Sequence, residues 1–164
     1  MNLDSYTIND KTLAIVPISR KKSKVYENQN IIIVNKSTNK IISENCEYFG
    51  SSYAGRKKGT MELIGITHKA PILIEDSHNL IFFPTTSPRL NDCSWISLNN
   101  IDSYFPHDDE SLITFQNNLT IQVNVSNKII NNQVLRATRL ESVANKRKFN
   151  FSQERNNQKN VKNI

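Results

Sequence analysis

One stretch of the chain, Cys46–Thr60, combines the residue types that suit contact with an anion. Three consecutive cations, Arg56, Lys57 and Lys58, lie between two glycines, whose backbone can come close to a partner. Three aromatic rings precede these cations, at Tyr48, Phe49 and Tyr53. Positive charge, aromatic surface and permissive backbone together favour binding of a polyanion. The alternative is a turn followed by the solvated start of a basic helix.

The same stretch comes close to the phosphate-binding loop of nucleotide hydrolases but lacks its chemistry. The pattern G-x-x-x-x-G-K-[ST] requires a lysine after the second glycine and then a hydroxyl that ligates Mg²⁺. Here Arg56 follows Gly55, and Lys57 occupies the position of the hydroxyl. Because a cation cannot ligate a dication, we reject nucleotide hydrolysis.

The other residues that are able to do acid, base or nucleophilic chemistry do not form a recognisable set. None of the histidines accompanies a nucleophile signature such as G-x-S-x-G; they are His68, His78 and His107. The three carboxylates of Asp108–Glu110 follow a proline and are expected in a solvent-exposed turn. We therefore predict neither an enzyme nor a cofactor.

The two cysteines, Cys46 and Cys93, are most simply interpreted as reduced thiols. A zinc site completed by a histidine is one alternative, and an enzyme site built on the two thiols is another. The chain has no C-x-x-C pair, and a structural zinc site needs four ligands, so we predict no metal.

The length and charge of the chain limit the class of protein and the class of partner. A chain of 164 residues with a net charge of +6 predicts one domain and an anionic partner, which is nucleic acid, an anionic membrane or an acidic protein. No apolar run approaches the ~18 residues of a membrane span, and the N-terminus lacks the features of a secretory signal. We therefore expect a cytoplasmic protein with no membrane partner.

Apolar and alternating runs between turn residues predict a chain that is mostly β-sheet. The expected strands span residues 6–9, 12–18, 30–35, 40–43, 66–74, 80–83, 93–98, 99–105, 111–115 and 119–125. Strands 30–35 and 40–43 are expected to form a hairpin across Ser37–Asn39, with Ile31–Val34 buried on both faces. The basic run Arg20–Lys24 is expected to be a loop.

A short central helix is expected to begin near Tyr53, after a cap at Ser51 or Ser52. Two glycines within it, Gly55 and Gly59, each weaken a helix by about 1 kcal/mol relative to alanine. A helix that keeps such residues needs its backbone close to a partner, or else packs closely on the sheet.

From Ser126 to Phe149 the apolar period becomes helical. One face of this helix is apolar: Ile130, Val134, Ala137, Leu140 and Ala144. A neighbouring stripe is basic: Lys128, Arg136, Arg139, Lys146 and Arg147. Residues 150–164 hold few apolar side chains and are expected to be a disordered basic tail. The predicted architecture is therefore an α+β fold, mostly antiparallel β-sheet with a short central helix and a C-terminal basic amphipathic helix, in a single domain over residues 1–149.

Several blocks of sequence, in a fixed order, resemble the competence transcription factor family ComK. The first is Cys46-x-Tyr-Phe-Gly-Ser-Ser-Tyr-Ala-Gly-Arg-Lys-x-Gly-Thr60. The next are Ile66-Thr-His-Lys-Ala-Pro-Ile-Leu-Ile74, Ile81-Phe-Phe-Pro-Thr85 and Cys93-Ser-Trp-Ile-Ser97, with a weaker match at Asn132-Gln-Val-Leu-Arg-Ala-Thr-Arg-Leu140. The stronger blocks cover about residues 44 to 105.

This resemblance implies a sequence-selective, DNA-binding transcriptional activator of the competence genes for DNA uptake. Such proteins bind A/T-rich promoter boxes through the minor groove, as dimers that associate further. The partners implied are double-stranded DNA, further copies of the chain, RNA polymerase and a proteolytic adaptor, in the nucleoid region of the cytoplasm. The tail Phe149–Arg155 departs from the aromatic-basic tail through which the family reaches that adaptor.

Our candidate DNA-binding residues are Arg56, Lys57, Lys58, Lys69, Arg136 and Arg139. We assign Arg56 to an A/T minor groove, whose narrow, negative trough attracts arginine. We assign phosphate contacts to Lys57 and Lys58. The two arginines of the C-terminal helix would also contact phosphates and so hold the protein in register on the duplex. The rival reading is a basic protein-binding adaptor or regulator of the same fold without DNA selectivity.

Overall fold

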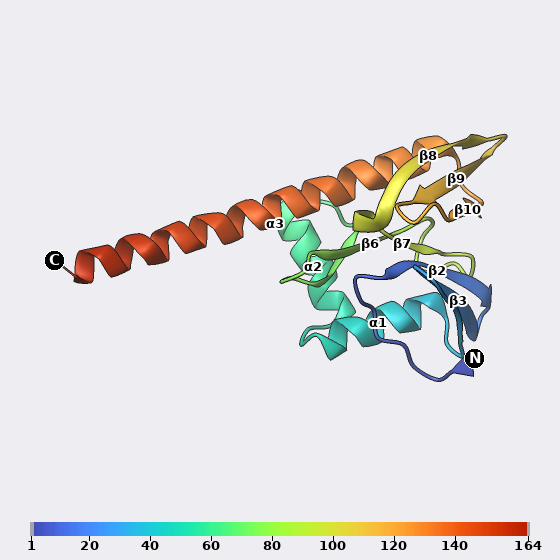
Figure 1. Cartoon of the computed structure of the whole chain (residues 1–164), viewed down its shortest axis with the longest axis horizontal. Coiled ribbons are helices and arrows are strands. Elements are labelled where there is room, and N and C mark those ends of the chain that lie inside the picture. The colour runs from blue at the N-terminus through green and yellow to red at the C-terminus, as the bar shows by residue number, and fades with distance from the viewer. Residues whose placement is uncertain (1, 164) are drawn as a thin grey trace.

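The computed structural model describes residues 2–163 as two β-sheets with helices on their faces and at one edge (Figure 1). In chain order the elements are β1 (Asn2–Leu3), β2 (Thr12–Ser19), β3 (Lys22–Glu27), β4 (Ile31–Val34), α1 (Thr38–Tyr48), α2 (Tyr53–Ile64), β5 (Ile72–Glu75), β6 (Leu80–Pro84), β7 (Trp95–Ser97), a 3₁₀ turn (Leu98–Asn100), β8 (Ile101–His107), β9 (Glu110–Phe115), β10 (Thr120–Val123) and α3 (Asn127–Lys162). The predicted α+β fold is confirmed.

The larger sheet has seven strands in the order β1-β4-β3-β2-β7-β6-β5, and the smaller has three in the order β10-β9-β8. Neighbouring strands pair antiparallel, except that β1 runs parallel to β4. Turns join β5 to β6, over Asp76–Asn79, and β9 to β10, over Asn117 and Asn118, in the gaps between the strands expected at 66–74 and 80–83 and at 111–115 and 119–125.

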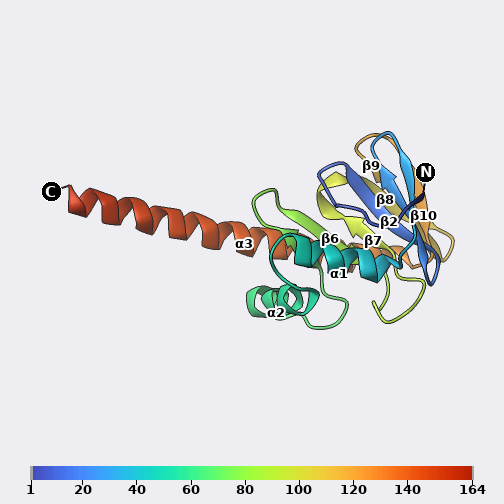
Figure 2. The same ribbon diagram turned by 90° about the horizontal axis from the view of Figure 1, so that it is seen from below.

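Both faces of the larger sheet are buried, so the protein has two cores. Alternate residues of β6 divide between them: Ile81 and Phe83 face one core, and Leu80 and Phe82 face the other. α3 and the smaller sheet close the first core, which we call the α3 core, and α1 closes the second, the α1 core (Figures 1 and 2). Burial on both faces explains why the segments of β5 and β6 are continuous apolar runs.

α2 lies at the β5 edge of the sheet and contacts both α1 and α3. Tyr53 packs against the α1 core, whereas Ile64 packs against the α3 core. Thr60 is buried and donates a hydrogen bond from Oγ1 to the carbonyl of Pro71 at 2.6 Å, which ties α2 to the segment before β5. The middle of the chain therefore bridges the two cores.

The predicted cap of α2 is confirmed at Ser52, whose Oγ accepts a hydrogen bond from the Gly55 N–H at 2.9 Å. The helix ends at Gly65, where φ is 72°. This left-handed conformation favours glycine, because a side chain there would be strained.

The predicted hairpin over 30–35 and 40–43 is wrong, because residues 38–48 form α1 instead. Buried positions in α1 follow a helical period: Thr38, Ile41, Ile42, Asn45 and Cys46. Two of these five are polar, which hid the period in the sequence. Ser37, interpreted as a turn residue, caps the helix by accepting a hydrogen bond from the Lys40 N–H.

Other local expectations also need correction. Residues 6–9 form no strand; the side chain of Asn45 holds this segment by accepting from the Ile8 N–H at 2.8 Å and donating to the Tyr6 carbonyl at 2.9 Å. Ile31 is 57% exposed, so β4 is not buried on both faces. Of the predicted loop at 20–24, residues 22–24 belong to β3. Strand β5 begins at Ile72 rather than at residue 66.

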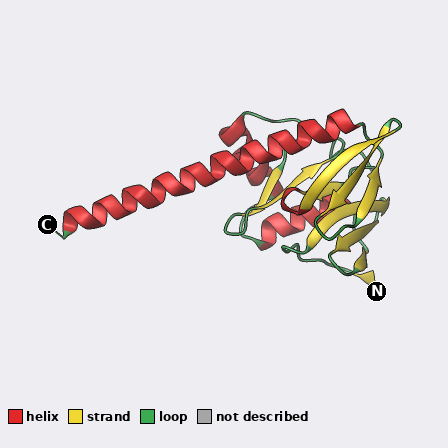
Figure 3. Ribbon diagram, turned by 45° about the horizontal axis from the view of Figure 1, so that its top comes forward, coloured by secondary structure: helices red, strands yellow, loops and turns green. Residues whose placement is uncertain are grey.

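The C-terminal helix begins as predicted, with Ser126 as its cap, but it does not end near residue 149. α3 continues to Lys162, and every described residue from 149 onward is exposed. The tail predicted to be disordered is therefore helical over residues 150–162, and Ile164 lies outside the described residues. Figure 3 shows the C-terminal part of α3 projecting away from the sheets. Among the described residues, no helix has the length and hydropathy to cross a membrane.

Candidate nucleic-acid interface

A cavity of about 500 Å³ opens between α1, α2, the segment before β5 and the loop after β6. Its lining is basic and hydroxyl-rich: Asn39, Ser43, Tyr53, Lys57, Thr67, His68, Lys69, Ala70, Ser87, Pro88 and Arg89. The lining that the structure describes holds three cations and no carboxylate. An anion is therefore the ligand that this charge favours.

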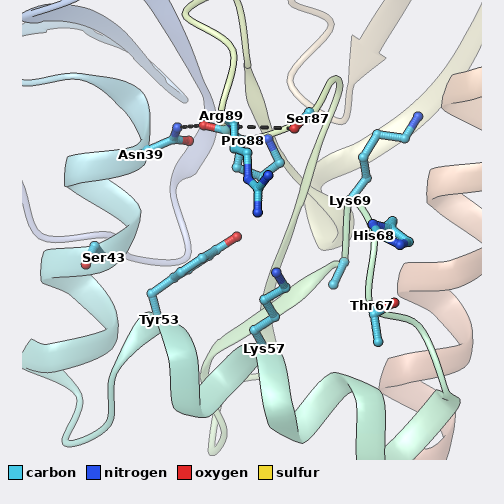
Figure 4. Close-up of a pocket in the computed structure, with 11 residues that line it drawn as sticks. Asn39, Ser43, Tyr53, Lys57, Thr67, His68, Lys69, Ser87, Pro88 and Arg89 are labelled. Carbon is cyan, nitrogen blue, oxygen red and sulfur yellow. Dashed lines mark hydrogen bonds between the residues drawn. The ribbon is translucent and has the colours of Figure 1, made fainter.

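Three polar groups of the lining converge. Figure 4 shows the Tyr53 hydroxyl, the Lys57 ammonium and the Arg89 guanidinium pointing into the same space, whereas the Lys69 side chain points away from them. The Tyr53 ring packs edge-on against Trp95, with ring centroids 6.3 Å apart. Burial raises the pKa of Tyr53 above its ordinary value of 10, so the hydroxyl remains a hydrogen-bond donor at neutral pH.

Helix α1 holds the loop that carries Arg89. The amide of Asn39 donates to the carbonyl of Pro88, and its oxygen accepts from Nε1 of Trp95 at 2.9 Å. The hydroxyl of buried Thr38 donates to the carbonyl of Cys93 at 2.7 Å. The first turn of α1 thus fixes both sides of the loop between β6 and β7.

Helix α3 holds the segment that carries Lys69, whose φ of 49° is left-handed. Buried Gln133 donates from Nε2 to the Lys69 carbonyl at 2.9 Å and to the Pro84 carbonyl at 2.7 Å. Arg136 donates from its guanidinium to the His68 carbonyl at 3.1 Å. Arg136 therefore contacts the wall of the cavity from outside.

The positive surface continues beyond the cavity. A smaller hollow of about 150 Å³ shares Asn39 and Arg89 with it and is also lined by Arg20, from the turn between β2 and β3. We use the name basic face for the following residues: Arg20, Lys57, Lys69, Arg89 and Arg136. Its members come from five separate segments of the chain.

The structure brings some of the six predicted site residues together and leaves others apart. Lys57 and Lys69 line the cavity, and Arg136 hydrogen-bonds to its wall. Lys58 and Arg139 are exposed but do not line the cavity. None of the six forms a salt bridge to a carboxylate within the described residues. Two other cations of α3 do so: Arg147 pairs with Glu62, and Lys148 pairs with Asp76.

Arg56 differs from its neighbours because it is partly enclosed. Its Nε is buried without a hydrogen-bond partner among the described residues. The positive charge of Arg56 also lowers the pKa of Cys46 in α1. Burial of that thiol has the larger effect and raises its pKa to about 11. One turn further, a Cβ added at Gly59 would meet nothing within 4 Å, so close packing within the described protein does not explain that glycine.

Sequence reasoning missed Arg89. The residue follows Pro88 in a loop with no periodicity, so nothing in the local sequence indicates which way its side chain points. The backbone of this loop is held by α1, an element that the sequence did not predict.

The two cysteines are buried and free. Burial raises the pKa of Cys93, like that of Cys46, to about 11, so both are neutral thiols near pH 7. Within residues 2–163 no three His, Cys, Asp or Glu side chains are grouped as metal ligands would be.

Comparison with known proteins places the chain among transcription factors. A family model described as ComK protein matches residues 3–148. The competence transcription factor of Bacillus subtilis (strain 168) is 37% identical over 144 residues, which cover 85% of this chain and 75% of that protein. No solved structure matches the chain.

Proposed function

This chain belongs to the ComK family, and from that premise we propose that it is a transcriptional regulator of competence that binds duplex DNA through the basic face. The observation that carries the proposal is the grouping of Lys57, Lys69 and Arg89 around one cavity whose described lining contains no carboxylate. Cations that lack a protein partner can replace the counterions of a phosphate backbone, which is the main source of affinity for DNA.

The proposal extends to A/T-rich promoter boxes read through the minor groove, with activation of the genes beside them. Phosphate contacts position a protein on DNA but carry little sequence information, so selectivity requires a further contact. A narrow A/T groove attracts an inserted arginine. Arg56 remains the residue that we assign to this contact, and Arg139 and Lys58 remain assigned to phosphates outside the cavity.

We propose that the protein binds DNA as a homodimer or a larger homo-oligomer, since each subunit of a dimer can bind one of two half-sites on the duplex. RNA polymerase and a proteolytic adaptor are further proposed partners, and the nucleoid is the proposed location. We propose no enzyme activity, because the two thiols are buried and neutral.

The decisive experiment compares binding of an A/T-box duplex and a scrambled duplex over a series of salt concentrations, with a minor-groove ligand as competitor. We expect tighter binding to the A/T-box duplex, a steep loss of affinity with salt, and displacement by the competitor. Equal affinity for both duplexes would favour the rival, a basic protein-binding regulator without DNA selectivity.

Two variants separate groove contact from phosphate contact. Arg56→Ala should remove the preference for the A/T-box duplex while keeping part of the general affinity. Lys57→Ala should weaken both duplexes alike and lower the slope of log affinity against log salt by about 1. Thermal unfolding of both variants is needed as a control, because Arg56 is partly enclosed. Equal effects of Arg56→Ala on both duplexes would remove the groove assignment.

A further inference from the structure

The geometry points to a phosphate seat formed by Tyr53, Lys57 and Arg89, in which one backbone phosphate of the bound duplex is held inside the cavity. This inference rests on the proposed function, and it goes further by naming the residues and the chemical group that they hold. It also gives different roles to two lysines that are adjacent in the sequence: Lys57 belongs to the phosphate seat, and Lys58 does not.

The chemistry of the three side chains suits a phosphate. The planar guanidinium of Arg89 can donate two parallel hydrogen bonds to phosphate oxygens, and the Lys57 ammonium adds a compact positive charge. The Tyr53 hydroxyl supplies a neutral donor that points into the same space (Figure 4). Two cations and one hydroxyl thus point into a cavity whose described lining contains no carboxylate.

The seat is held in place by contacts that it does not itself use for binding. Tyr53 packs on Trp95, which donates to Asn39, and Asn39 also holds the carbonyl of Pro88 beside Arg89. Donors that are fixed before binding lose little conformational entropy when the ligand arrives. The Tyr53 ring and the backbone beside Arg89 are therefore in place before the anion binds.

The arrangement of charge favours a polymer as the source of the phosphate. The volume of about 500 Å³ is in the range of small-molecule sites, so a phosphate and the adjoining sugar can enter. Arg20 and Arg136 lie outside this volume, beside Arg89 and His68 respectively. Only a ligand that extends beyond the cavity can also contact Arg20 and Arg136, and the backbone of a nucleic acid is such a ligand.

The first test measures variants of the full chain with both duplexes. Arg89→Gln and Lys57→Gln should each weaken binding to the A/T-box and scrambled duplexes by about tenfold and lower the salt slope by about 1. Tyr53→Phe keeps the ring on Trp95 and should weaken both duplexes with an unchanged salt slope, because no charge is lost. Lys58→Gln is the matched comparison: the same charge is removed from the next residue of the same helix, and the loss should be clearly smaller.

Several results would overturn the seat while leaving DNA binding intact. Equal losses for Lys57→Gln and Lys58→Gln would mean that general charge, rather than the cavity, determines affinity. An unchanged affinity for Arg89→Gln, in a variant with parental thermal unfolding, would also contradict it. If Arg89→Gln does not fold, Lys57→Gln and Tyr53→Phe decide the question by themselves.

The second test uses inorganic phosphate as the probe and the duplex only as its competitor. Titration of the isotopically labelled protein with inorganic phosphate should shift the amide signals of Tyr53, Lys57 and Arg89, and the A/T-box duplex should displace the phosphate. AMP that binds at least tenfold more tightly than phosphate and resists displacement would overturn the inference in favour of a free-nucleotide site. Phosphate binding in a protein that binds no duplex would refute the proposed function and retain only the anion site.

Discussion

Lys57 and Lys58 carry the same charge at adjacent positions, yet they face different surroundings. Successive residues of an α-helix point about 100° apart, so Lys57 turns into the cavity while Lys58 faces solvent outside it. Arg56, on the other side of Lys57, is partly enclosed, and its charge acts on Cys46 of α1. A run of three cations is therefore three separate environments rather than one patch.

The buried thiols allow a prediction at the same scale. Because burial raises the pKa of Cys46 and Cys93 from 9.0 to about 11, both should react very slowly with a thiol reagent at pH 8 in the folded protein and rapidly in urea. The raised pKa values also mean that the unfolded thiols ionise first, so the free energy of unfolding should fall as the pH rises from 9 towards 11.

Reaction kinetics with a disulfide reagent, with and without urea, measure this reactivity. Fast reaction of either thiol in the folded protein would contradict its burial and would revive the rival reading of a cysteine enzyme site. A Cys46→Ser, Cys93→Ser double variant that binds DNA normally would exclude that rival.

At the scale of elements, two helices that contribute little charge to the cavity determine where its cations lie. α1 holds the Arg89 loop through Thr38 and Asn39, and α3 holds the Lys69 segment through Gln133. Gln133 occupies a position in the apolar face of α3, where a polar side chain needs buried partners, and two backbone carbonyls supply them. These helices are therefore supports for the basic face.

Substitution of Asn39 tests the support given by α1. Asn39→Ala should lower the free energy of unfolding by about 1–3 kcal/mol, because buried Trp95 loses the acceptor of its indole N–H. It should also weaken both duplexes, because the loop that carries Arg89 loses its tie to α1. Urea unfolding and duplex binding measure the two effects.

Lys40→Ala provides the control for this variant on the same helix. The Lys40 ammonium is exposed and lies 3.9 Å from a carboxylate oxygen of Glu44. Such an exposed surface pair contributes little to the free energy of unfolding. Its loss should leave the free energy of unfolding nearly unchanged. If Asn39→Ala lowers stability but not duplex affinity, the Arg89 loop is held by contacts other than α1.

At the scale of the whole molecule, a compact two-core domain carries a long projecting helix (Figures 1 and 3). The projecting part makes no contribution to either core, since every described residue from 149 onward is exposed. Residues 150–164 hold three cations, Arg155, Lys159 and Lys162, and one carboxylate, Glu154, for a net charge of +2. The projection therefore adds charge and reach rather than packing.

A chain ending at residue 149 tests this division. We expect its melting temperature to remain close to that of the full chain, because no buried side chain is removed. Its affinity for both duplexes should fall, with a salt slope lower by up to about 0.9 for each of the three cations that contacts a phosphate.

Circular dichroism melting and a salt series of duplex binding measure these effects. A large loss of melting temperature would show that residues 1–149 are not an independent domain. An unchanged salt slope would remove the helix projection from the DNA contact and leave it free for another copy or another partner.

The sequence by itself determined the family, the α+β class and the elements whose signal is local. The Ser52 cap, the start of the C-terminal helix at Ser126, the turn at Asp76–Asn79 and the hairpin over Asn117 and Asn118 all follow from residues within a few positions of one another. Cap and turn preferences are properties of the local backbone, so they can be recognised without knowing the rest of the fold.

Only the tertiary structure decided that residues 38–48 form a helix and which cations line the same cavity. The polar residues Thr38 and Asn45 are buried in α1 because distant backbone groups, on Cys93, Ile8 and Tyr6, satisfy their hydrogen bonds. Arg89 shares a cavity with Lys57 for a similar reason, since hydrogen bonds between residues 49 and 55 positions apart fix its loop. Long-range hydrogen bonds and packing leave no periodic trace in the sequence, so the position of the basic cavity became visible only with the fold.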